Sequence, residues 1–284
     1  MSNPYENLWI YYLEGIPERG LQRKSNQSFI GNWQEEGFSF LFFSAPADEL
    51  VERMVQEDSG ICLVDRYEMT GEQWHGETIE SYTTGSLCIS PPWKIPFVNR
   101  PDIRHVLLDP GVVFGTGRHQ TTEDCLGYIE YLCKYRNLSI GNVLDLGTGT
   151  GLLALGAAVL GCKAVLALDF NLLAVRTARR NVEMNGLCER IIVIQGKAEE
   201  FISVPADLVV ANIHYDVMKR IIDNPGFGDH KWFILSGLLK SEAEKVKVML
   251  CDKGIHIVEA VSRDGIWNTI LASGAIYSCN NNQG

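Results

Sequence analysis

Short apolar runs alternate with longer segments of helical periodicity in the C-terminal two-thirds of the chain. Such runs predict strands that are buried on both faces, at residues 142–146, 164–169, 191–195, 208–212 and 232–236. Helices are predicted at residues 121–135, 152–160, 172–185, 215–222 and 241–251. Strands that alternate with helices predict an α/β fold with a parallel sheet covered on both faces.

The last predicted elements differ, because two extended segments follow each other directly. Residues 255–261 and 267–271 flank an Asp264-Gly265 turn, which predicts an antiparallel hairpin. Five parallel strands closed by such a hairpin are typical of a class I, Rossmann-like, seven-stranded methyltransferase domain. We therefore predict this fold class for residues 119–284.

The N-terminal part has the pattern of a small α+β domain over residues 1–90. Its predicted elements are strands at 8–13, 29–33, 38–43, 61–64 and 87–90, with a helix at 46–56. Residues 91–118 are rich in proline and glycine and have little periodic pattern, so they are predicted to be a linker.

Composition and charge limit the classes of partner. The net charge is −10, which disfavours direct nucleic-acid binding; it suits a basic protein partner but alone indicates only solubility. No apolar run reaches the ~18 residues of a membrane helix, and the N-terminus has no signal pattern. The eight cysteines have no Cys-x-x-Cys spacing, which disfavours a metal site. We expect a cytoplasmic monomer that binds neither membrane nor metal.

A glycine-rich loop, Asp145-Leu-Gly-Thr-Gly-Thr-Gly151, ends the first parallel strand and opens a helix. Gly147, Gly149 and Gly151 let the backbone approach a ligand beyond the carboxyl end of the sheet. A dinucleotide loop would have its third glycine at Leu152, and the carboxylate of Asp145 disfavours a pyrophosphate. The loop therefore predicts S-adenosylmethionine rather than NAD as the cofactor.

Two further strand ends carry candidate site residues. Asp169 ends the second strand, where a carboxylate can accept both ribose hydroxyls, and Phe170 beside it could contact the adenine. Asn212 ends the fourth strand and could accept a hydrogen bond from an acceptor amine. The alternative is that Asn212 caps the helix that starts at Tyr215.

A long motif resembles the signature of a known family. Residues 108–122, Leu-Asp-Pro-Gly-Val-Val-Phe-Gly-Thr-Gly-Arg-His-Gln-Thr-Thr, are similar to the signature of the PrmA family, the methyltransferases of ribosomal protein L11. Residues 210–213 and 235–239 resemble two further family motifs, and the resemblance covers residues 86–273. Val113 and His214 depart from the family pattern.

The resemblance implies a role for individual residues. Contacts to S-adenosylmethionine are implied for Thr122, Gly147, Asp169 and Asn212, with Phe114 and residues 115–117 over its methionine end. His119 and Trp267 would line the channel of the acceptor amine. The N-terminal domain would be a ferredoxin-like substrate-recognition domain, whose first helix would fall on residues 17–25.

The implied activity is N-methylation of lysine and/or α-amino groups of ribosomal protein L11. Three alternatives stay open: methylation of lysine in another protein such as an electron-transfer flavoprotein subunit, a non-catalytic cofactor-binding module, and a dehydrogenase. The intact Asp145, Gly147, Asp169 and Asn212 argue against the second, and Leu152 argues against the third.

Overall fold

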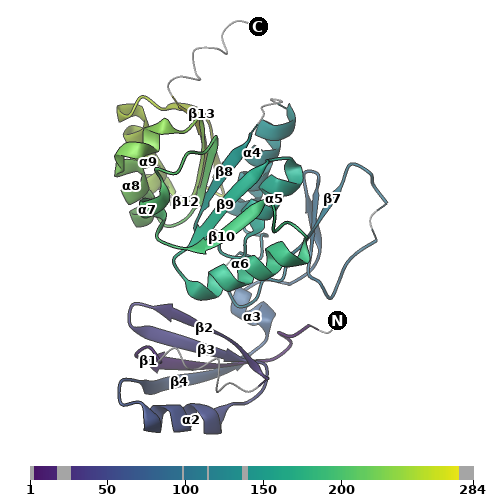
Figure 1. Ribbon diagram of the computed structural model, residues 1–284, viewed down its shortest axis with the longest axis vertical. Coiled ribbons are helices and arrows are strands. Elements are labelled where there is room, and N and C mark those ends of the chain that lie inside the picture. Colours follow the sequence, from purple (N-terminus) through teal and green to yellow (C-terminus); the bar gives the residue numbers. More distant parts are fainter. Residues whose placement is uncertain (1–2, 18–26, 98, 114, 136–139, 275–284) are drawn as a thin grey trace, which may run out of the picture.

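A seven-stranded sheet forms the centre of the C-terminal part of the chain (Figure 1). The computed structural model describes residues 3–17, 27–97, 99–113, 115–135 and 140–274. The sheet has the order β10-β9-β8-β11-β12-β14-β13. Its strands are β8 Asn142–Leu146, β9 Ala164–Asp169, β10 Ile191–Gln195, β11 Leu208–Asn212, β12 Trp232–Leu239, β13 His256–Arg263 and β14 Trp267–Ser273. β8 to β12 are parallel and β14 is antiparallel to both its neighbours, which confirms the predicted fold class.

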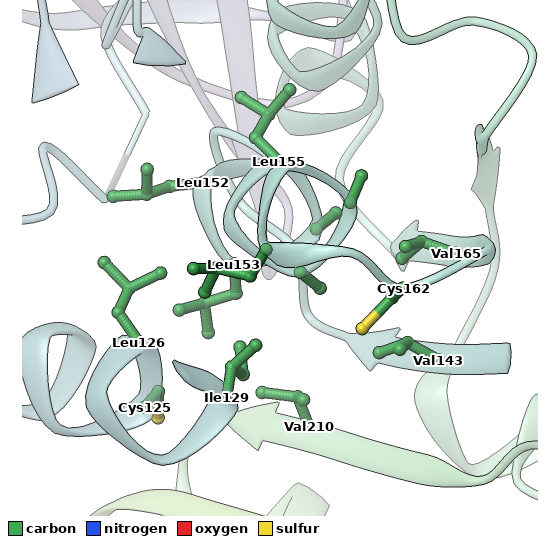
Figure 2. Close-up of a cluster of buried hydrophobic side chains, with 14 of the residues drawn as sticks. Cys125, Leu126, Ile129, Val143, Leu152, Leu153, Leu155, Cys162, Val165 and Val210 are labelled. Carbon is green, nitrogen blue, oxygen red and sulfur yellow. The ribbon is translucent and has the colours of Figure 1, made fainter. Parts of the chain in front are cut away.

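Helices cover both faces of this sheet. One face carries α4 Gln120–Glu130 with its π-helical continuation η1 Tyr131–Tyr135, α5 Leu152–Leu160 and α6 Leu172–Met184. The other carries α7 Ala198–Phe201, α8 Tyr215–Asp223, the 3-10 helix η2 Pro225–Asp229 and α9 Lys240–Asp252. Successive strand residues point to opposite faces, so Val143 packs in the first layer and Leu144 in the second. Figure 2 shows Leu126 and Ile129 of α4 in the first layer, close to Leu153 of α5.

A separate antiparallel sheet, β2-β3-β1-β4, forms the N-terminal part. Its elements are β1 Leu8–Glu14, β2 Phe29–Glu35, β3 Phe38–Phe43, α2 Asp48–Glu57, β4 Cys62–Met69 and the short α3 Gly71–His75. β4 extends well beyond the predicted strand at 61–64. It is an edge strand whose Asp65, Arg66 and Glu68 are exposed, so it lacks the apolar alternation of a half-buried strand. The implied first helix was expected at residues 17–25, of which residues 18–25 lie outside the described residues.

A third, small sheet joins the large domain. It contains β5 Tyr82–Thr84, β6 Leu87–Ser90 and β7 Arg104–Leu107, in that order. β7 lies within residues 91–118, where the sequence predicted no strand; only Val106 of its four residues is fully buried, so it carries no pattern. Leu87 and Ile89 of β6 belong to the same buried cluster as Leu126 of α4. By its packing, β6 therefore belongs with the large sheet rather than with the N-terminal one.

Asn181 of α6 and Asn185, the C-terminal cap of this helix, bind the end of β7 and the residues after it. Asn185 accepts from the N–H of Leu107 at 2.9 Å and donates to its carbonyl at 2.7 Å. Asn181 does the same with Asp109, at 2.8 and 2.9 Å, and also donates to the carbonyl of Thr150 at 2.8 Å. One helical turn rises ~5.4 Å and two strand residues ~6.6 Å, so the two amides match alternate residues. The two side-chain amides thus hydrogen-bond the backbone of this segment at alternate residues, as an adjacent β-strand would.

The N-terminal sheet packs on the start of α6. Leu8, Ile10 and Phe42 form one buried cluster with Leu173 and Ala174 of that helix. The sheet face opposite α2 is therefore joined to the large domain by apolar contacts.

Polar contacts add to this interface along residues 109–113. The hydroxyl of Tyr5 donates to Oδ1 of Asp109 at 2.6 Å, and Nε1 of Trp74 donates to the carbonyl of Val112 at 3.0 Å. Burial and the neighbouring Asp109 raise the pKa of Tyr5, so its hydroxyl remains a donor at neutral pH.

We predict that a C-terminal fragment needs the small sheet to fold well. A fragment of residues 91–284 would lose Leu87 and Ile89, and each buried side chain of this kind stabilises by ~1.5–3 kcal/mol. It should be less stable than residues 78–284 by at least ~3 kcal/mol in urea unfolding. If the two fragments unfold at the same urea concentration and with the same dependence of the free energy of unfolding on urea, the assignment of β6 to the large domain is contradicted.

Candidate active site

The glycine loop connects β8 to α5 at the carboxyl edge of the large sheet. Gly147, Gly149 and Gly151 have φ values of 75°, 55° and 86°, in the left-handed region that favours glycine. The N–H of Gly147 donates to the carbonyl of Leu168, at the end of β9, at 2.9 Å. A Cβ on Gly147 would collide with the side chain of Ile213, which follows β11. Glycine is therefore required where the ends of β8, β9 and β11 converge.

Two buried carboxyl groups flank this loop. Asp169 accepts from the N–H groups of Gly149 at 3.0 Å and Asn171 at 2.9 Å. Asp145 accepts from the Thr148 hydroxyl through Oδ2 at 2.6 Å, while its Oδ1 is buried and has no hydrogen-bond partner among the described residues. Burial raises the pKa of Asp145 to about 7 and also raises that of Asp169. A buried carboxyl oxygen of this kind fits a cationic or hydrogen-donating group.

Asn212, at the end of β11, lies beside α4. Its Nδ2 is 3.3 Å from Oγ1 of Thr122. The cap position of α8 is occupied by His214, so the alternative that Asn212 caps this helix is wrong. Gly237 of β12, to which no role was assigned from the sequence, has a φ of 81°, and a Cβ there would lie 3.1 Å from Oδ1 of Asn212. Glycine at this position leaves space at the amide oxygen.

His119 and Trp267 meet although they are far apart in the sequence. His119 is the residue before α4, and Trp267 begins β14. Their ring centroids lie 5.1 Å apart at an interplanar angle of 78°, an edge-to-face pair. Nδ1 of His119 is also 2.7 Å from Oγ1 of Thr121. The pair lies between α4 and the closing hairpin, and both side chains are partly exposed.

Two aromatic residues, Phe170 and Phe114, were predicted to contact the cofactor, and the structure describes only the first of them. Phe170, next to Asp169, is 58% exposed, so its ring is available to a ligand at the end of β9. Phe114 lies outside the described residues. The backbone next to it reaches the glycine loop, because the carbonyl of Gly115 accepts from the hydroxyl of Thr150 at 2.7 Å.

The structure thus brings most of the predicted site residues to one edge of the sheet. The first set, Asp145 and Asp169, surrounds the glycine loop and offers carboxyl oxygens. The second set, Asn212, His119 and Trp267, combines a side-chain amide with two aromatic rings. Within the described ranges, no group of three His, Cys, Asp or Glu side chains could hold a metal ion. No helix in the same ranges is long and apolar enough to cross a membrane. The first set suits a cation that also carries hydroxyl groups.

Comparison with known proteins gives the relatives of this chain. The family model described as ribosomal protein L11 methyltransferase (PrmA) matches residues 38–274. Curated relatives of that name include one from Bacillus pumilus, 35% identical over 65% of this chain and 58% of its own length. One from Clostridium botulinum (strain Alaska E43) is 32% identical over 76% of this chain and 68% of its own length. One from Brevibacillus brevis is 37% identical over 67% of this chain and 60% of its own length. The matches thus span 58–68% of the length of these relatives.

One solved structure of a protein with a similar name aligns with this chain, and a second shares its fold. A ribosomal protein L11 methylase from Lactobacillus delbrueckii subsp. bulgaricus aligns with a TM-score of 0.60 at 29% identity, over 69% of this chain and 98% of its own. The human methyltransferase 10 domain containing protein aligns with a TM-score of 0.50 at 20% identity, over 60% of this chain and 90% of its own, and shows the fold alone. Since the family model matches more than half of the chain, this protein belongs to the ribosomal protein L11 methyltransferase (PrmA) family.

Proposed function

We propose that this protein transfers methyl groups from S-adenosylmethionine to lysine and/or α-amino groups of ribosomal protein L11. The observation that carries the proposal is the meeting of two sets of side chains at the sheet edge. Asp145 and Asp169 flank the glycine loop, and Asn212 lies beside Thr122. Family membership and the names of the relatives support the choice of acceptor. A ribosomal acceptor would place the reaction in the cytoplasm.

The residues around the glycine loop fit S-adenosylmethionine, which supplies an electrophilic methyl group when bound. Oδ1 of Asp145 is buried without a described partner and suits the cationic methionine end. Each oxygen of Asp169 accepts one backbone N–H and keeps a lone pair for a ribose hydroxyl. The exposed ring of Phe170 adds an apolar surface for the adenine.

The second set of residues suits an amine. Because Nδ2 of Asn212 donates to Thr122, its Oδ1 is the atom that accepts an N–H of the acceptor and directs the nitrogen lone pair. A lysine with a pKa of ~10.4 costs ~5 kcal/mol to deprotonate at pH ~7, whereas an α-amine with a pKa of ~8 costs only ~1 kcal/mol. Partial burial against His119 and Trp267 would lower the pKa of the amine. Orientation alone can supply ~7–11 kcal/mol.

We also propose that the N-terminal sheet, within the predicted domain of residues 1–90, recognises the acceptor protein. This sheet packs on the start of α6 through one face and exposes the edge strand β4. The acceptor would then contact the catalytic edge and the N-terminal sheet together.

A labelled transfer assay tests the proposed function. Incubation with methyl-labelled S-adenosylmethionine should label purified bacterial L11, and mass spectrometry should locate methyl groups on lysine or the N-terminus. A basic ribosomal protein of similar size serves as the matched control. Equal labelling of both proteins, or labelling of neither, would contradict the proposed acceptor.

Cofactor affinity should depend on the ionisation of Asp145, whose pKa is about 7 before binding. A cationic cofactor favours the carboxylate, so binding releases a proton below this pKa. The dissociation constant should therefore fall about tenfold between pH ~6 and ~8. The free energy of unfolding of the cofactor-free protein changes with pH in the opposite direction. Between pH 3.8 and about 7 the carboxyl group of Asp145 is protonated in the folded state but ionised in the unfolded state. This group therefore makes the protein less stable as the pH rises through that range.

Calorimetry in two buffers of different ionisation enthalpy measures both affinity and proton release. Asp145→Asn removes the titrating group and should flatten the pH dependence. If the wild type binds equally at both pH values, or if Asp145→Asn keeps the slope, the assignment of Asp145 to the cationic end is wrong.

Asn212→Ala should slow chemistry more than it affects stability. The substitution removes the amide oxygen that orients the amine, and such misplacement costs on the order of a hundredfold in rate. We expect that loss in the single-turnover rate at saturating cofactor, with a melting temperature close to that of the wild type. His214→Ala is the matched control, because His214 is exposed and its side chain makes no capping hydrogen bond. A normal single-turnover rate in Asn212→Ala would refute the proposed role.

A further inference from the structure

The turn of the closing hairpin is tied to the start of α4 by two polar contacts. Arg263, at the end of β13, donates from Nε and Nη2 to Oδ1 of Asp124 at 3.0 and 2.6 Å. Gln120 donates to Oδ2 of Asp264 at 2.7 Å. The Asp124 side chain is only 4% exposed, whereas Arg263 is 50% exposed. A buried carboxylate held by a half-exposed guanidinium fixes the hairpin more firmly than a surface ion pair would.

The carboxylate of Asp124 also contacts β14 of the large sheet, and through it reaches β12. Oγ1 of Thr269 in β14 lies 3.4 Å from Oδ2 of Asp124 and 2.6 Å from Oγ of Ser236 in β12. Ser236 and Thr269 are fully buried, and Ser236 is the register partner of Asn212. Asp124 therefore joins α4 to β14 and, through Thr269, to Ser236 of β12, the strand neighbour of the residue proposed to orient the amine.

α4 and the closing hairpin, which Asp124 and Arg263 join, both carry residues close to Asn212 or to the ring pair proposed to bind the acceptor amine. α4 carries Thr122, the partner of Asn212, and has His119 as its N-terminal cap. The hairpin carries Trp267, whose ring meets that of His119 at 5.1 Å. The turn also borders an open surface hollow of about 550 Å³, lined in part by Gly265 and Ile266. The contacts to α4 therefore set the position of Trp267 relative to Asn212.

We propose that Asp124 and Arg263 are positioning residues for the methyl acceptor. Neither lies in the set around the glycine loop; they act by holding the hairpin so that Trp267 and His119 leave a channel of fixed shape beside Asn212. The inference rests on the proposed function, because it assigns the two residues to the acceptor side of that site. Loss of the pair should weaken acceptor use and leave cofactor binding intact.

The test uses the full chain with Arg263→Ala, Arg263→Lys and Asp124→Asn. For Arg263→Ala we expect kcat/KM for L11 to fall about ten- to a hundredfold, while the dissociation constant of S-adenosylhomocysteine changes less than about twofold. Arg263→Lys keeps the charge and should recover part of the loss. Arg100→Ala is the matched control, because it breaks an exposed Arg–Asp pair and should leave both kcat/KM and the dissociation constant unchanged.

Hydrogen exchange gives a readout that does not depend on the acceptor. Residues 264–268 and 119–122 should exchange faster together in Arg263→Ala, and Asp124→Asn should show the same pattern if the alanine variant folds poorly. Unchanged exchange in both segments, or a parallel loss of cofactor affinity and acceptor use without lysine rescue, would overturn the positioning role. Coupled exchange in a protein that methylates no L11 would support the positioning role and overturn the proposed acceptor.

Discussion

Much of the structure depends on the amide of Asn181, which is fully buried in α6. It hydrogen-bonds both backbone groups of Asp109 and the carbonyl of Thr150. A buried unpaired backbone group costs ~1–3 kcal/mol, so this side chain stabilises the position of the segment after β7 next to the glycine loop.

From Asp109 the same chain of contacts reaches the N-terminal sheet. Tyr5 donates to the carboxylate of Asp109, whose backbone Asn181 holds. Thr150, on the other side of Asn181, donates to Gly115 and so holds the residues before α4. The proposed recognition domain and the proposed cofactor loop are therefore linked through one buried polar path rather than through a flexible connection.

The central sheet could be predicted from the sequence because its strands are apolar on both faces, and the first four predicted parallel strands have the bounds seen in the structure. The glycine loop, Asp169 and Asn212 followed from their places at strand ends. β7 was missed because it is short and half exposed, and β4 was predicted too short because its edge is charged. Asp124 and Arg263 are 139 residues apart, and no local pattern predicts that such distant polar residues meet.

The packing of the N-terminal sheet on α6 also constrains how the chain folds as it is made. Strands β1 to β4 are complete once residue 69 has been synthesised, yet Leu8, Ile10 and Phe42 need Leu173 and Ala174 as partners. More than a hundred residues must emerge before that apolar face is covered. During synthesis this face is open to chaperones and to other nascent chains, so translation speed across residues 70–174 sets how long the protein is exposed to misassembly.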